Sequence, residues 1–178
     1  QWRGRPLDEK DIDKFTERIA RLDIPVVSHA SYLINLASPN DTLWKRSLES
    51  LDEEMGRAEV LGLAAVILHP GAYTTSAEQE GLRRISEGIT EVLTRRRDES
   101  TRLLLEHTAG QGTVLGYRFE QLRTIIDDLE DNRRVGICLD TCHLVGAGYD
   151  IISPDGQDRV FDDFGTIIGF DRLEAIHL

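Results

Sequence analysis

The sequence predicts an α/β fold in which helices cover a parallel sheet. Segments with apolar residues at helical spacing alternate with short, continuously apolar runs, and this unit recurs five times in 178 residues. Continuous apolar runs are typical of strands buried on both faces, and helices between such strands form right-handed βαβ units. The composition, 40% hydrophobic and 30% charged, is that of a globular protein with one sizeable core.

Five segments are predicted to be helices because their apolar residues recur every three or four positions. They span residues 8–22, 43–61, 78–96, 118–130 and 158–168. In the first, Ile12, Phe15 and Ile19 share one face. Gly62 directly follows the second and is expected to be its C-cap.

Each predicted helix leads into a predicted strand, and each strand is followed by or ends on an ionisable residue. The strands span residues 24–27, 64–68, 102–105, 135–139 and 173–176. The ionisable residues, in the same order, are His29, His69, Glu106, Asp140 and His177. Because the carboxyl ends of parallel strands open onto one face, where active sites are built, these five side chains are expected to converge.

The converging residue types indicate a metal site. Imidazole and carboxylate without thiolate suit zinc first, with manganese or iron as alternatives. Glu106 lies at the end of the middle strand and could bridge two ions, which would hold a shared water as hydroxide for attack on phosphorus. Glu106 is therefore the expected catalytic residue of a hydrolase.

Charge and composition narrow the possible partners. A net charge of -11 argues against a surface that grips nucleic acid everywhere, although metal ions at an acidic site would still allow local contact. There is no apolar stretch near 18 residues and no signal-peptide pattern, so we expect no membrane association and a cytoplasmic location. Cys138 and Cys142 are expected to be reduced packing residues.

Two glycine-containing loops and two arginine clusters have less specific interpretations. The loop 107–112 after Glu106 either brings its backbone close to a ligand or is a tight turn, and the loop 145–150 is more simply a turn. The clusters 95–97 and 133–134 are expected to be solvated helix ends rather than nucleic-acid contacts.

Four segments carry a specific resemblance to a known family. They are HASYLINLASP (29–39), ILHPGAY (67–73), LLLEHTAGQGTVLGYRFEQL (103–122) and VGICLDTCHLVGAGYDI (135–151). They closely resemble the signature segments of the endonuclease IV family of apurinic/apyrimidinic endonucleases, which belongs to the xylose-isomerase-like barrels. The resemblance covers nearly the whole chain, and DTCH followed by AGYD, together with TAGQG, is highly specific to this family.

The resemblance implies a (β/α)8 TIM barrel with three zinc ions, which hydrolyses the phosphodiester 5′ to an abasic site in double-stranded DNA. It implies that Glu106 bridges the first ion to the second. The first ion would also be bound by His29 and His69, the second by Asp140 and His177, and the third by His143. The complete protein is expected to be a monomer.

The resemblance also assigns a DNA contact and marks one departure. Tyr32 matches a family residue that pushes into the DNA at the lesion and helps to hold it kinked. The family usually has Asn where this chain has His107, a change that either alters the surroundings of Glu106 or is tolerated.

The length predicts an incomplete barrel. A full barrel needs about 250 residues, and both ends of this chain look cut. Residues 1–178 are therefore expected to be one partial TIM-barrel domain covering about strands 2 to 6, without the first strand and the last two βα units. The family's remaining ligands, an Asp-x-His pair and a Glu, would lie beyond Leu178.

Two alternatives remain open. A divalent-metal sugar isomerase or epimerase on the same barrel would explain the strand-end pattern, although not TAGQG or the DTCH spacing. An inactive fragment that only binds metal or DNA is the other, because a partial barrel leaves strand edges unpaired and metal sites short of ligands.

Overall fold

The strands form a parallel sheet in the order of the sequence. A computed structural model describes residues 4–96 and 100–178. The strands are β1 (Val27–His29), β2 (Ala65–Leu68), β3 (Arg102–Glu106), β4 (Val135–Asp140) and β5 (Leu173–His177). Each pairs in parallel with the next, giving the order β1-β2-β3-β4-β5. This arrangement confirms the predicted α/β class.

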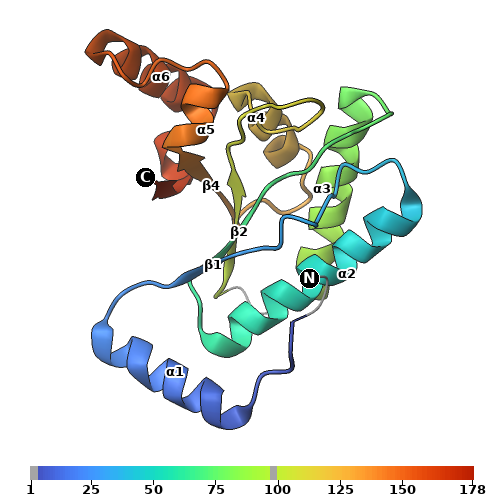
Figure 1. Ribbon diagram of the computed structural model, residues 1–178, viewed down its shortest axis with the longest axis vertical. Coiled ribbons are helices and arrows are strands. Elements are labelled where there is room, and N and C mark those ends of the chain that lie inside the picture. Colours follow the sequence, from blue (N-terminus) through green and yellow to red (C-terminus); the bar gives the residue numbers. More distant parts are fainter. Residues whose placement is uncertain (1–3, 97–99) are drawn as a thin grey trace.

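The helices lie mainly along one side of this sheet. They are α1 (Glu9–Leu22), α2 (Asp41–Leu61), α3 (Glu78–Arg95), α4 (Phe119–Asp127), α5 (Thr141–Gly146) and α6 (Pro154–Ile167), with a 3-10 helix η1 (Phe170–Arg172) before β5. Figure 1 shows α2, α3 and α4 beside the strands, whereas α1 lies apart at the β1 end of the fold. α1 contributes no buried residue to the core.

The two faces of the sheet bury different sets of side chains, because successive residues of a strand point to opposite faces. On the helix side, Val66, Leu103 and Ile137 join the large core formed with α2, α3, α4 and α6. On the opposite, inner face, a smaller apolar cluster lies across the strands. It consists of Ala65, Ile67, Leu104 and Cys138, with Ala175 packed against them.

Several element boundaries differ from those that the sequence predicts. The predicted strand 24–27 is wrong: β1 begins at Val27, where its partner begins at Ala65, and Ile24 is exposed. An apolar run does not show where pairing with a neighbour starts. α6 begins at Pro154 rather than at 158, because the Ser153 hydroxyl accepts a hydrogen bond from the Gly156 N–H and caps it.

Capping explains two further outcomes. Gly62 has φ +66° and ends α2, which confirms the predicted C-cap. The glycines of residues 145–150 predict a loop, but Val145 and Gly146 belong to α5. This short helix begins where the Asp140 carboxylate accepts a hydrogen bond from the His143 N–H at 2.8 Å.

The arginine clusters are only partly solvated. Arg95 is exposed, as expected, but Arg96 forms ion pairs with Asp52 and Glu59. Arg134 is buried and donates hydrogen bonds to the Arg96 and Thr101 carbonyls. The solvated interpretation is therefore wrong for Arg96 and Arg134, while Arg97 lies outside the described residues.

The two cysteines are both free thiols, as expected, but only one is a packing residue. Cys138 is buried on the inner face, whereas Cys142 is exposed on α5. Within residues 4–96 and 100–178, none of the helices combines the length and the apolar character needed to cross a bilayer.

Candidate metal centre

The inner apolar cluster fixes where the ionisable side chains point. Each of four predicted ligands lies two residues beyond a member of this cluster and so faces the same way. The pairs are Ile67 with His69, Leu104 with Glu106, Cys138 with Asp140, and Ala175 with His177. The strand register also sets Asp140 directly opposite His177. The predicted convergence at the carboxyl ends of the strands is present.

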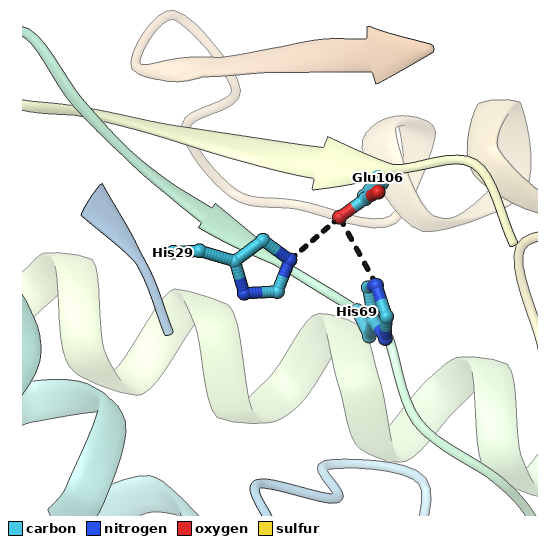
Figure 2. Close-up of side chains that lie close together, drawn as sticks. All are labelled: His29, His69 and Glu106. Carbon is cyan, nitrogen blue, oxygen red and sulfur yellow. Dashed lines mark hydrogen bonds and ion pairs between the residues drawn. The ribbon is translucent and has the colours of Figure 1, made fainter. Parts of the chain in front are cut away.

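Glu106 is the centre of this convergence. Its carboxylate is 1% exposed, and its Oε2 atom lies 2.7 Å from His29 Nε2 and 3.0 Å from His69 Nε2. Figure 2 shows the two imidazole rings reaching the same carboxylate oxygen from different strand ends. The two rings are nearly perpendicular, with centroids 5.0 Å apart. The three residues that the resemblance implies for the first ion thus form one cluster.

The other carboxylate oxygen faces a second set of side chains. His177 Nδ1 lies 3.0 Å from Glu106 Oε1 and 3.6 Å from Asp140 Oδ2. His143 Nδ1 lies 3.4 Å from Glu106 Oε1 and 3.9 Å from Asp140 Oδ1. Glu106 therefore stands between two sets of potential ligands, one on each of its oxygens.

Backbone carbonyls fix the orientation of two of the imidazoles. His29 Nδ1 donates to the Ala30 carbonyl at 2.8 Å, and His143 Nδ1 donates to the His107 carbonyl at 2.8 Å. Because a carbonyl only accepts, Nδ1 of each ring carries a proton. His29 Nε2 also faces an acceptor, the Glu106 carboxylate at 2.7 Å, so this ring donates from both nitrogens. In His143 the bond to the His107 carbonyl leaves Nε2 of the neutral ring as the electron-pair donor. Sequence reasoning did not find these carbonyl partners, since side-chain identity carries no signal for them.

The electrostatics of the cluster favour an ionised carboxylate. Burial by itself would raise the pKa of Glu106, but hydrogen bonds from His29, His69 and His177 together hold this pKa far below its usual range. The pKa of His29 is raised, chiefly by its hydrogen bond to Glu106. A buried carboxylate anion surrounded by imidazole nitrogens is an arrangement that can bind a cation.

Two groups of side chains have the spacing to hold a metal ion. One is His29, His69 and Glu106, and the other is Glu106, Asp140 and His143. In each group the ligand atoms all lie within 4.8 Å of one another. Nitrogen and oxygen donors from imidazole and carboxylate fit divalent transition metals. Both groups contain Glu106, which is the residue expected to bridge.

Tyr32 lies near this centre in sequence but outside the cluster. It follows His29 by three residues, in the connection between β1 and α2, and its side chain is 81% exposed. An exposed aromatic ring is available to a partner that stacks on it.

The loop 107–112 is held against the following residues by several hydrogen bonds. Thr108 N donates to the Gly116 carbonyl at 3.1 Å, and the Thr108 hydroxyl donates to the Leu115 carbonyl at 2.9 Å. Leu115 N in turn donates to the Gly71 carbonyl at 2.8 Å. Gly110 has φ +76°, and a Cβ there would lie 2.7 Å from Tyr117 Cγ. The glycine is therefore required by the turn itself, and the loop joins the segments that follow β2 and β3.

Comparison with known proteins identifies the class of fold. The family described as xylose isomerase-like TIM barrel matches residues 1–178, so the chain belongs to this family. A D-tagatose 3-epimerase-like protein shares the fold with a TM-score of 0.76 at 23% identity, over 96% of this chain and 62% of that one. The predicted TIM-barrel architecture is thereby confirmed.

Within that family, the chain is similar to endonuclease IV. It is 44% identical over 178 residues to a probable endonuclease 4 of Geotalea daltonii, and 40% identical over 179 residues to one of Chloroflexus aurantiacus. The crystal structure of endonuclease IV from Thermus thermophilus superposes with a TM-score of 0.84 at 34% identity, over 99% of this chain and 61% of that one. These findings confirm the resemblance that the motifs indicate.

The chain spans only part of its relatives. It covers 62% of the Geotalea daltonii sequence and 63% of the Chloroflexus aurantiacus sequence. Six of the residues that the resemblance implies as ligands lie in the matched part, between His29 and His177.

Proposed function

We propose that this chain belongs to a zinc-dependent endonuclease that cuts DNA on the 5′ side of abasic sites, in base excision repair. The observation that carries the proposal is the position of Glu106, whose two carboxylate oxygens face two separate sets of ligands. Similarity to endonuclease 4 proteins at 40% identity or more supports the same reaction class.

Each ligand has a stated part in this proposal. His29 and His69 hold the first ion together with Glu106, and Asp140 and His177 hold the second. Bound zinc ions would supply a hydroxide nucleophile near neutral pH and neutralise charge on the phosphodiester. Glu106 would be a ligand of both ions, and its carboxylate, 1% exposed, is shielded from bulk water.

His143 and Tyr32 complete the proposed site. His143 would bind a third ion through Nε2, since its Nδ1 already donates to the His107 carbonyl. The exposed ring of Tyr32 inserts at the lesion, where a missing base leaves a gap in the stack. The DNA contact is local, which is compatible with a net charge of -11.

A cleavage assay tests the reaction. A duplex labelled at one end and carrying one tetrahydrofuran abasic analogue is incubated with the zinc-loaded protein, with the protein treated with EDTA, and with an abasic endonuclease as positive control. We expect one EDTA-sensitive cut on the 5′ side of the analogue, with a 3′-hydroxyl on the upstream fragment. An intact duplex in the zinc-loaded sample, when the positive control cuts, would contradict the proposal.

The same preparation separates the alternatives. Turnover of a ketose by the metal-loaded protein, without incision of DNA, would identify a sugar epimerase. Zinc binding without turnover of either substrate would identify a binding fragment.

We further propose that residues 1–178 form one partial TIM-barrel domain, that the complete protein is a monomer, and that it works in the cytoplasm.

A further inference from the structure

His107 is a fully buried histidine beside the metal centre that the proposed reaction does not use. It follows Glu106 directly, is 0% exposed, and its ring packs against both Phe119 and Tyr149, with centroids 5.5 and 5.3 Å away. Its Nε2 atom lies 2.9 Å from the Tyr117 carbonyl, whereas its buried Nδ1 has no hydrogen-bond partner. The ring therefore carries its proton on Nε2 and donates it to Tyr117.

This hydrogen bond is the last of three that close the loop after β3. The Leu115 carbonyl accepts from the Thr108 hydroxyl at 2.9 Å, and the Gly116 carbonyl accepts from Thr108 N at 3.1 Å. The Tyr117 carbonyl then accepts from the His107 ring. Three consecutive carbonyls are thus held by two consecutive residues, and the imidazole is long enough to reach the third.

The backbone of residue 107 connects this closed loop to the metal centre. Its N–H donates to the Cys138 carbonyl on β4 at 2.9 Å, and its own carbonyl accepts from His143 Nδ1 at 2.8 Å. Residue 107 is therefore anchored at two points, its backbone amide and its ring. Together these two bonds orient its backbone carbonyl. That carbonyl decides which nitrogen of His143 carries the proton.

We propose that His107 is a positioning residue for His143: its ring, bonded to the Tyr117 carbonyl, holds the 107 carbonyl against His143 Nδ1 and so leaves Nε2 to bind metal. The inference rests on the proposed function only in taking His143 as a ligand. Hydrogen-bond partners that orient ligating histidines commonly change metal affinity by about 10- to 100-fold when they are removed.

The wild-type protein provides the first test. Long-range proton–nitrogen correlation spectra of the metal-free, 15N-labelled protein report which nitrogen of each imidazole is protonated. At about pH 8.5, where an unperturbed imidazole is neutral, we expect the proton on Nδ1 in His143 and on Nε2 in His107. A proton on Nε2 of His143 would overturn the proposal, and this result requires no variant to fold.

Two variants and one control then test the ring itself. His107→Leu removes the bond to Tyr117, whereas His107→Gln keeps an N–H that can reach the same carbonyl. In zinc titrations against a chromophoric chelator, we expect His107→Leu to lower the zinc affinity of the His143 site by about 10- to 100-fold. The variant should also populate both tautomers of His143. His107→Gln should keep both near wild type, and the ion held by His29 and His69 should bind unchanged in either variant.

Phe119→Leu is the packing control, because it loosens the ring's surroundings and leaves its hydrogen bond in place. Equal losses of zinc affinity in Phe119→Leu and His107→Leu, or none in His107→Leu, would reduce His107 to a packing residue. These readouts are independent of DNA cleavage. A protein that cuts no DNA but shows the expected tautomers would contradict only the proposed function.

Discussion

His29 Nε2 and Glu106 Oε2 lie 2.7 Å apart, although 77 positions separate the two residues in the sequence and strand β2 lies between their strands. Neighbouring strands are about 4.8 Å apart, so side chains two strands apart meet only if both lean inward over the same face. The contact shows that the carboxyl ends of β1, β2 and β3 converge on one point. Glu106 is that point.

The charge of Glu106 is predicted to be necessary for metal binding. Glu106→Gln keeps the shape of the side chain but removes the anion that faces both sets of ligands. We expect zinc affinity to fall by more than about 100-fold. Removing a hydrogen-bond partner of a metal ligand lowers affinity by up to about 100-fold, and Glu106 would itself be a ligand. Competition titration against a chromophoric chelator measures the loss.

Glu49→Gln is the matched control for that variant, because it makes the same change on an exposed position of α2. It should bind zinc like the wild type. Equal zinc affinity in Glu106→Gln and in the wild type would show that the carboxylate is not a ligand.

The two ligand groups are predicted to lose their ions separately. His69→Gln should remove the ion of the first group, and Asp140→Asn should weaken the ion of the second while preserving the cap of α5, since Asn caps helices as well as Asp does. Metal content after equilibrium dialysis, measured by mass spectrometry, gives the stoichiometry. Loss of all metal in both variants would point to one shared site instead of two.

The convergence of the candidate ligands is predictable from the sequence because their spacing along the strands is periodic. His69, Glu106 and Asp140 follow apolar strand residues at a spacing of two, and parallel strands bring their ends together. The sequence could not place β1, because the run 24–27 is apolar throughout and the pairing of Val27 with Ala65 is a tertiary contact. It also missed α5, whose six residues are too few for a helical repeat to show.

Arg96 is predicted to stabilise the fold, unlike its neighbour Arg95. Its guanidinium pairs with Asp52 and Glu59, whose carboxylates are 26% and 13% exposed. Arg96→Ala removes this partner of Asp52, leaves Glu59 with only Arg134 at 3.7 Å among the described residues, and should lower the free energy of unfolding by about 2 kcal/mol. Arg95→Ala removes only an exposed pair with Glu91 and should cost about 0.5 kcal/mol or less.

Urea denaturation of the two variants measures this difference. Equal stability of Arg96→Ala and Arg95→Ala would mean that the Arg96 network contributes nothing. The same contrast explains why the sequence does not distinguish the paired arginines from the solvated ones. Adjacent arginines at a helix end look alike in the sequence, and only the acidic residues of α2, about forty positions away, distinguish them.

The two thiols are predicted to react differently. Cys138 is 0% exposed in the inner cluster, whereas Cys142 is exposed on α5. A thiol reagent with a coloured product should modify one cysteine in the native protein and two in denaturant. Rapid reaction of both thiols in the native protein would contradict the packing of the inner face.

The hydrogen bonding of His107 could not be predicted from a motif or from periodicity. Its position after Glu106 was visible in the sequence, but its bond to the Tyr117 carbonyl depends on how the loop closes. Backbone acceptors such as the Ala30 and His107 carbonyls orient the imidazoles without leaving a residue signature. The convergence of these side chains is therefore predictable from the sequence, whereas the orientation of their imidazole rings is not.

The central claim, that Glu106 joins two metal ions, is tested most directly by anomalous X-ray diffraction from zinc-loaded crystals of the protein. We expect one anomalous peak about 2.0–2.2 Å from His29 Nε2, His69 Nε2 and one Glu106 oxygen, and a second peak near the other Glu106 oxygen and Asp140. Peaks elsewhere, with the Glu106 carboxylate bonded only to imidazole, would contradict it.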